Sequence, residues 1–438
     1  MMDNKLTNKS LARCCLQLRP SRLAGPLVLS LLGLWLAPYS VLASGQHDGA
    51  RNQPSTRHSD KTPARLSSYY STLQNHEAEG PYHQNSSEVL YSLGLELQKG
   101  GQHGKALKAL RRAMHINRVN RGLNSLSQAP MLRSIINSQK YLMNFEPVTN
   151  SYHQLLRMHM ASYGKQDPRI APLLNELALW HIDAYQFDES SKRIDHLTSA
   201  NSLITGALKL NQAQATPKLR QQIKLLRSAA LISFHLSRHQ GDEWSASTDS
   251  HYSLSADGFA TTNPQRTGIL NGASFRRGKV CHERIIALTA SIPTASLQEN
   301  LQAQTELADW YLLFNRRKEA MFHYQQVLAK IAASDQVDAL HANLFTTPRL
   351  LPALRMENHE SRGAALFMTA DVNISEKGWG SHIENIGETL FADQSPASKT
   401  SLRYMFIDTI KGSRFRPQFV DNKPAYVSDV RVKIPLIH

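Results

Sequence analysis

Apolar residues recur at spacings of three and four from Ser86 to about Ile331, and this pattern constrains the fold more than any other feature of the chain. Such spacing gathers apolar side chains on one helix face, so the stretch is predicted to be mostly helical. Ser86, Ser87 and Glu88 can start the first helix. Residues 240–271 interrupt the pattern with Ser, Thr, Asp, Gly and Asn, which predicts a long surface loop within the helical region.

Small residues stand where successive helices of this region would cross closely. Gly94, Ala106 and Ala113 mark one helix-turn-helix hairpin, and Ala308 and Ala320 mark a second. A weaker copy runs through residues 174–197. The pattern resembles the tetratricopeptide repeat, whose unit is about 34 residues long. The resemblance implies a helical solenoid over residues 85–335 with a core of these small positions, and an irregular helical bundle is the alternative.

The spacing of the apolar residues changes towards the C-terminus. Residues 365–374 and 381–386 predict two strands joined by a turn, the helical spacing from Leu402 to Ile410 predicts a helix that ends at Gly412, and residues 427–434 predict a last strand. The order is strand, strand, helix, strand. The predicted fold class is therefore multidomain, with an all-α solenoid followed by a small α+β domain over residues 362–438.

The helix of this small domain ends in Arg414, Phe415, Arg416 and Pro417, and a turn at residues 421–425 follows. In these features the domain resembles the C-terminal domain of the TonB family. The resemblance implies a periplasmic protein that contacts outer-membrane partners, in the best-known case by strand pairing with a short peptide. Residues 355–362 lack the Tyr-Pro element that usually precedes the first strand in that family. The chain also has no Pro-rich spacer of the kind that lets a transducer cross the periplasm.

The N-terminus has the pattern of a secretory signal peptide. A basic segment precedes the apolar run Leu23–Ala37, and residues 41–43 provide a cleavage site before Ser44. An uncleaved inner-membrane anchor is the alternative, because no charged residue lies between Arg22 and Asp48. The predicted location is the periplasm. Residues 44–84 are polar and predict a disordered linker, and residues 336–361 predict a second linker.

Cleavage after residue 43 would leave Cys281 as the one cysteine, which predicts a buried free thiol. The basic excess of the chain lies in residues 85–335, which hold 29 Lys and Arg against 19 Asp and Glu. This excess fits either a solvated surface or attraction to an anionic partner. An exported chain is a poor candidate for nucleic acid, so an anionic envelope surface or an acidic protein is expected instead.

The sequence offers no catalytic constellation, and neither a cofactor nor a metal site is expected. It lacks the G-x-S-x-G, GxGxxG, phosphate-loop, C-x-x-C and H-E-x-x-H motifs. His235 and His239 stand four residues apart on a predicted helix, but two imidazoles do not complete a metal site. Asp242 and Glu243 are the only nearby residues that could add ligands.

The sequence favours a non-enzymatic envelope scaffold that acts through protein–protein interaction. The alternative from the transport class is a TonB-like energy transducer to outer-membrane transporters. The last strand is the predicted partner-binding edge, and it comprises Val427, Val430, Val432 and Ile434. The partner, the oligomeric state and the pathway are not encoded in any motif of the chain.

Overall fold

A computed structural model describes residues 62–187, 193–239, 267–352, 367–389 and 396–435 of the chain. Its first part is helical, with α1 (Thr62–Glu79), α2 (Ser86–Lys99), α3 (His103–Arg121), α4 (Ala129–Tyr141), α5 (Phe145–Tyr163), α6 (Ala171–Phe187), α7 (Arg193–Gln212), α8 (Leu219–Arg238), α10 (Thr267–Ala290), α11 (Leu297–Leu313), α12 (Arg317–Ala332) and α13 (Val337–Phe345). Short 3-10 helices at Leu126–Gln128 and Pro168–Ile170 precede α4 and α6. The remaining elements are β1 (Arg349–Leu351), β2 (Phe367–Ile374), β3 (Gly380–Thr389), α14 (Pro396–Gly412), β4 (Arg414–Arg416), β5 (Gln418–Val420), β6 (Lys423–Ala425) and β7 (Val427–Pro435).

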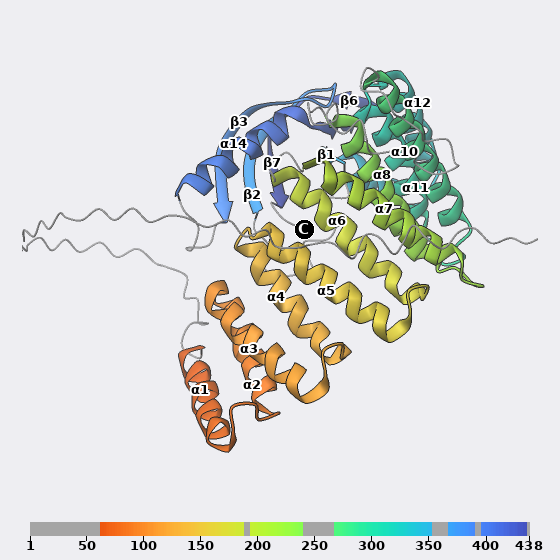
Figure 1. The fold of residues 1–438 in the computed structure, drawn as a ribbon. Coiled ribbons are helices and arrows are strands. Elements are labelled where there is room, and N and C mark those ends of the chain that lie inside the picture. The colour runs from red at the N-terminus through yellow and green to blue at the C-terminus, as the bar shows by residue number, and fades with distance from the viewer. Residues whose placement is uncertain (1–61, 188–192, 240–266, 353–366, 390–395, 436–438) are drawn as a thin grey trace, which may run out of the picture. The chain divides into compact units, whose positions relative to one another are not determined.

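Helices that follow one another in the chain pack against each other in pairs. The most extensive packing joins α2 to α3, α6 to α7, α8 to α10 and α11 to α12 (Figure 1). The helical prediction and the hairpin organisation are therefore confirmed. Among the described residues no helix is both long and apolar enough to cross a membrane.

The first hairpin shows why its small residues are needed. A Cβ atom built on Gly94 of α2 would lie 2.6 Å from two side-chain carbons of Leu110 on α3. Ala106 and Ala113 are completely buried. Larger side chains at these positions would separate the two helices.

The second hairpin has the same construction. Ala308 of α11 and Ala320 of α12 are both completely buried. The turn between the helices contains Asn315, whose φ of 61° lies in the left-handed region that Asn tolerates better than most residues. In the weaker copy, Ala178 of α6 and Leu197 of α7 are completely buried in one shared core cluster.

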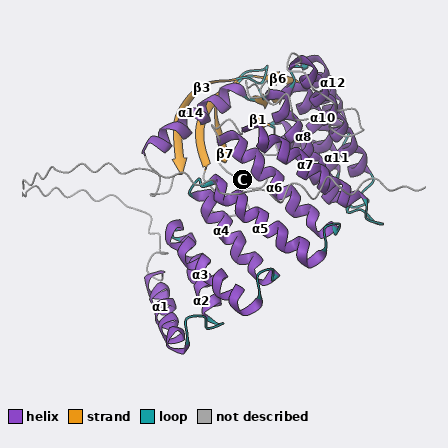
Figure 2. Cartoon of the chain, in the orientation of Figure 1, coloured by secondary structure: helices purple, strands orange, loops and turns teal. Residues whose placement is uncertain are grey.

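The main C-terminal elements follow the predicted order strand, strand, helix, strand, but three short strands that were not predicted, β4, β5 and β6, lie between α14 and β7. Strands β2, β3 and β7 form an antiparallel sheet in the order β3-β2-β7 (Figure 2). Burial alternates along β2, and Met368, Ala370, Val372 and Ile374 all face the core. Phe406 and Ile410 of α14 belong to the same buried cluster, so the helix packs on the apolar face of the sheet.

Two predicted linkers are wrong in part. Residues 44–84 were predicted to be disordered, but they contain helix α1. This helix is held against the first hairpin by buried Leu73 and by an ion pair between Glu77 and Arg112 of α3. Within the range 336–361, α13 buries Phe345 completely and β1 pairs with β4.

The last five residues of the predicted surface loop 240–271 belong instead to α10, which begins at Thr267. Residues 240–266 lie outside the described residues, as do the predicted signal peptide and its cleavage site.

The C-terminal elements are joined to the helices by a buried ion pair. The Arg416 guanidinium of β4 donates to both carboxylate oxygens of Asp309 on α11, at 2.9 and 2.5 Å. Both side chains are at least nine-tenths buried. The Tyr324 hydroxyl donates to Asp309 at 2.6 Å, and Arg416 also donates to the Leu344 carbonyl at 2.9 Å. Burial alone would lower the pKa of Arg416, but the adjacent carboxylate raises it above the ordinary value.

Arg414 makes a second connection two residues earlier. It donates to the side-chain oxygen of Asn315 in the α11–α12 turn at 2.7 Å, and its guanidinium carbon lies 3.1 Å from the ring centre of Trp379. Phe415, between the two arginines, points into the core and is completely buried. The Arg-Phe-Arg-Pro motif thus positions β4 against the second hairpin.

Replacing Gly94 by Val should lower the free energy of unfolding by about 1–3 kcal/mol, because the added carbons overlap Leu110. The matched control is Gly104→Ala on the exposed side of α3, where a Cβ meets no atom within 4 Å. That change should be neutral or stabilise the protein by up to about 1 kcal/mol. Chemical denaturation measures both, and equal stability of the two variants would contradict the close helix crossing at Gly94.

Candidate binding pocket

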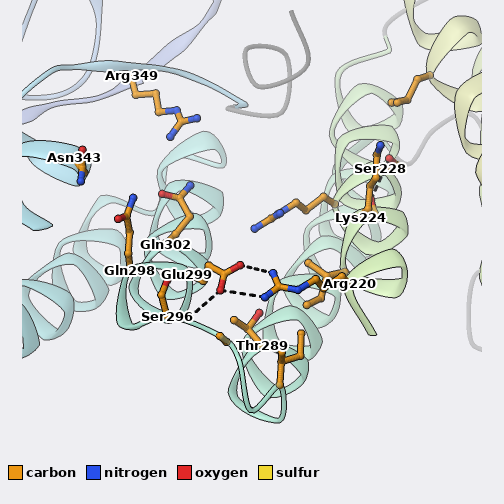
Figure 3. Close-up of a pocket in the computed structure, with 15 residues that line it drawn as sticks. Arg220, Lys224, Ser228, Thr289, Ser296, Gln298, Glu299, Gln302, Asn343 and Arg349 are labelled. Carbon is orange, nitrogen blue, oxygen red and sulfur yellow. Dashed lines mark hydrogen bonds and ion pairs between the residues drawn. The ribbon is translucent and has the colours of Figure 1, made fainter. Parts of the chain in front are cut away.

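A cavity of about 800 Å³ lies between α8, α11, α13 and β1. Four basic side chains and one carboxylate line it, and these are Arg220, Lys224, Arg227, Arg349 and Glu299. Figure 3 shows Arg220, Lys224, Glu299 and Arg349 around the opening, with Arg220 and Glu299 joined by a pair of contacts. The cavity therefore has an excess of positive charge.

A polar stripe on α11 forms one wall. Glu299, Gln302, Glu306 and Asp309 follow one another at spacings of three, four and three residues, which places them on one side of the helix. Glu299 is fixed at the helix start by a capping box with Ser296. The Gln302 side-chain amide donates to Glu306 at 3.1 Å.

A basic stripe on α8 faces this wall. Arg220, Lys224 and Arg227 are spaced four and three residues apart on that helix. Arg220 forms an ion pair with Glu299, and Arg227 donates to Glu306 at 3.0 Å. The Arg220 guanidinium, together with the Ser296 backbone N–H, holds the pKa of the Glu299 carboxyl below its usual value. Two of the three basic residues are therefore matched by carboxylates.

Lys224 is the unmatched member of the basic stripe. Among the residues that the structure describes, it forms no ion pair, and its side chain is exposed. The α11 position between the two carboxylates is the neutral Gln302. Figure 3 shows Lys224 extending into the opening, with Gln302 and Arg349 reaching towards the same space.

Arg349 reaches the cavity because of the strand pairing of β1 with β4. In that register Arg349 is opposite Arg416, and Leu351 is opposite Arg414. Since Arg416 is bound to Asp309 at the inner end of the α11 stripe, the same buried pair that attaches β4 to the helices also places Arg349 over the pocket.

The predicted edge strand is found at the edge of its sheet. Strand β7 pairs with β2, and no other described strand pairs with it. Its side chains are unequal, because Val432 and Ile434 are buried in the core while Val427 and Val430 are half-buried. Partner binding at this edge stays a prediction that would depend mainly on backbone atoms.

The histidines singled out from the sequence lie elsewhere. His239 hydrogen-bonds through Nδ1 to the Tyr185 hydroxyl at 3.2 Å, and the His235 ring is 6.1 Å from the Tyr185 ring. Within the described ranges no group of three or more His, Cys, Asp or Glu side chains could hold a metal ion. Asp242 and Glu243 lie outside those ranges.

The expected burial of Cys281 is confirmed. The thiol is free and buried on α10, and burial raises its pKa to about 11. At neutral pH it is therefore protonated and a poor nucleophile, as expected for a structural cysteine.

The pocket residues were missed by the sequence reasoning. The sequence does contain two patterns that could have indicated them. Basic residues stand at positions 220, 224 and 227, and acidic residues stand at 299 and 306 with the neutral Gln302 between them. What the spacing cannot show is that α8 and α11 lie side by side, since 79 residues separate Arg227 from Glu306.

No protein-family model matches this chain, and no curated protein matches it. Solved structures do align with it. The kinesin light chain nearly identical TPR-like repeats of Podosopora anserina share 14% identity, cover 60% of this chain and 98% of their own, and give a TM-score of 0.38. BtubC (BKLC) from P. vanneervenii shares 13% identity, covers 64% and 91%, and gives a TM-score of 0.38. The hairpin assignment rests on the packing of this chain's own helices.

Proposed function

We propose that this chain is a non-enzymatic scaffold whose pocket between α8 and α11 binds an acidic segment of a partner protein. The observation that carries the proposal is Lys224, which lies between two paired arginines and faces no carboxylate among the described residues. Helical repeat proteins commonly use their concave surfaces for binding extended partners.

The chemistry of the pocket favours a carboxylate or another anion as the group that enters. A charge-assisted hydrogen bond to Lys224 or Arg349 is stronger than a neutral one. Gln302 can add a neutral hydrogen-bonding group. The arginines that are already paired hold the walls in place, so the entering group need not order them.

The proposal is tested with a photo-reactive amino acid at Gln298, an exposed residue that lines the pocket. Light should produce a specific partner adduct, and adding Lys224→Gln should reduce its yield about tenfold or more, because a hydrogen bond to a charged group is lost. A probe at exposed Gln325 and the variant Lys209→Gln serve as controls away from the pocket. An adduct that persists at full yield in Lys224→Gln would refute the pocket as the binding site.

For the C-terminal region we propose a domain similar to that of the TonB family. Support comes from the order of β2, β3, α14 and β7, with the short strands β4, β5 and β6 before β7, and from the Arg-Phe-Arg-Pro motif that follows α14. In this proposal the domain is a fixed part of the scaffold, because Arg414 and Arg416 attach it to α11 and its turn. Its edge strand β7 would then be a second surface for an outer-membrane partner.

The proposed location is the periplasm, on the basis of the signal-peptide pattern in residues 1–43. Intact-mass measurement of the protein isolated from the cell envelope tests this. We expect a chain that begins at Ser44. A mass that includes residues 23–37 would instead favour an inner-membrane anchor and, with it, the energy-transducer alternative.

A further inference from the structure

Helix α3 carries the most one-sided charge of the described helices. Its sequence from His103 to Arg121 contains six Lys and Arg residues and no Asp or Glu. The buried side of the helix is formed by small and apolar residues, including Ala106, Leu110 and Ala113. Five of the six basic residues are exposed, and the sixth, Arg118, is half-buried and donates to the Gln128 side chain at 3.2 Å.

Exposure and spacing gather these charges on one face. Lys105, Lys108, Arg111, Arg112 and His115 are all exposed and follow one another at helical spacings. Arg112 pairs with Glu77 of α1. Lys105, Lys108 and Arg111 have no carboxylate within ion-pair distance in the described part of the chain. These three residues are called the α3 basic face.

Exposed apolar groups lie at the C-terminal end of the same helix. Val119 is 55% exposed and Leu123, just after the helix, is 71% exposed. Tyr82, which is 49% exposed, is held beside them because its carbonyl accepts a hydrogen bond from Asn120 at 3.0 Å and its ring contacts His115. Exposed apolar side chains that gather in one patch with a charged rim can mark an interaction surface.

We propose that the α3 basic face and this apolar end bind the surface of an anionic phospholipid bilayer. Lys105, Lys108 and Arg111 form no ion pair with any described residue. Such side chains suit diffuse attraction to lipid phosphates, which requires no fixed hydrogen-bond geometry. Exposed Val119, Leu123 and Tyr82 suit insertion into the headgroup region, as in interfacial helices. The proposal is independent of the pocket between α8 and α11, which contains no residue of α3.

The test is flotation of the full chain with vesicles of phosphatidylglycerol and phosphatidylcholine in equal parts, compared with phosphatidylcholine alone. The measured quantity is the ratio of the two partition coefficients, and it is compared between variants. The apolar run 23–37 acts equally on both vesicles, and the basic segment before it is the same in every variant. The triple change of Lys105, Lys108 and Arg111 to Gln should lower this ratio by about 100-fold, at roughly fivefold per basic residue. The matched control changes Lys209, Lys318 and Lys411 to Gln, which alters net charge equally on exposed sites of other helices.

The control should stay within about threefold of the wild type, because those residues lie away from α3. Leu123→Ser should weaken the part of the binding that survives high salt. Circular dichroism checks that each variant keeps its helical content. The proposal is overturned if the wild type shows no preference for the anionic vesicles, or if the control triple lowers the ratio as much as the α3 triple. Binding of an acidic protein to α3 without vesicle binding would also overturn it.

Discussion

The buried ion pair between Arg416 and Asp309 is the interaction on which the arrangement of helices and strands depends. Two fully desolvated charges are stable only when each is well hydrogen-bonded. Here Asp309 accepts from Arg416 and Tyr324, and Arg416 also donates to the Leu344 carbonyl. The pair therefore joins β4, α11, α12 and α13 in one hydrogen-bonded network. Because these bonds have defined geometry, the network fixes where β4 attaches to the helices, which apolar contacts alone would not do.

The pocket is a consequence of that attachment. One face of α11 carries Asp309 at its inner end and Glu306 and Glu299 further out, so the same helix binds β4 through one carboxylate and α8 through the others. Arg349 is held over the opening because β1 follows the register of β4. The positive charge of Lys224 stays available since the stripe has Gln302 where a further carboxylate would neutralise it.

Local features of the fold could be predicted from the sequence, whereas its long-range contacts could not. Periodicity predicted the hairpins around Gly94 and Ala320 and the strands β2 and β7, because the spacing of apolar residues within each element is a local feature. Helix α1 was missed because its burial rests on a few contacts such as Leu73, within a polar segment. Arg416 was recognised as part of a motif, but its partner is 107 residues away, and no spacing rule connects them.

The central claim is that the Arg416–Asp309 pair holds the C-terminal strands on the helices, and a double-mutant cycle on the free energy of unfolding tests it most directly. Arg416→Met alone should cost about 3–5 kcal/mol, because it leaves the Asp309 carboxylate buried without a cation. Adding Asp309→Leu should restore part of that loss, so the double variant is more stable than the sum of the two single changes predicts. Arg431→Met, which removes an exposed ion pair with Asp371 and hydrogen bonds to Thr369 and Asn385, should cost no more than about 1 kcal/mol. Additive losses in the cycle, or an Arg416→Met variant as stable as the control, would contradict the claim.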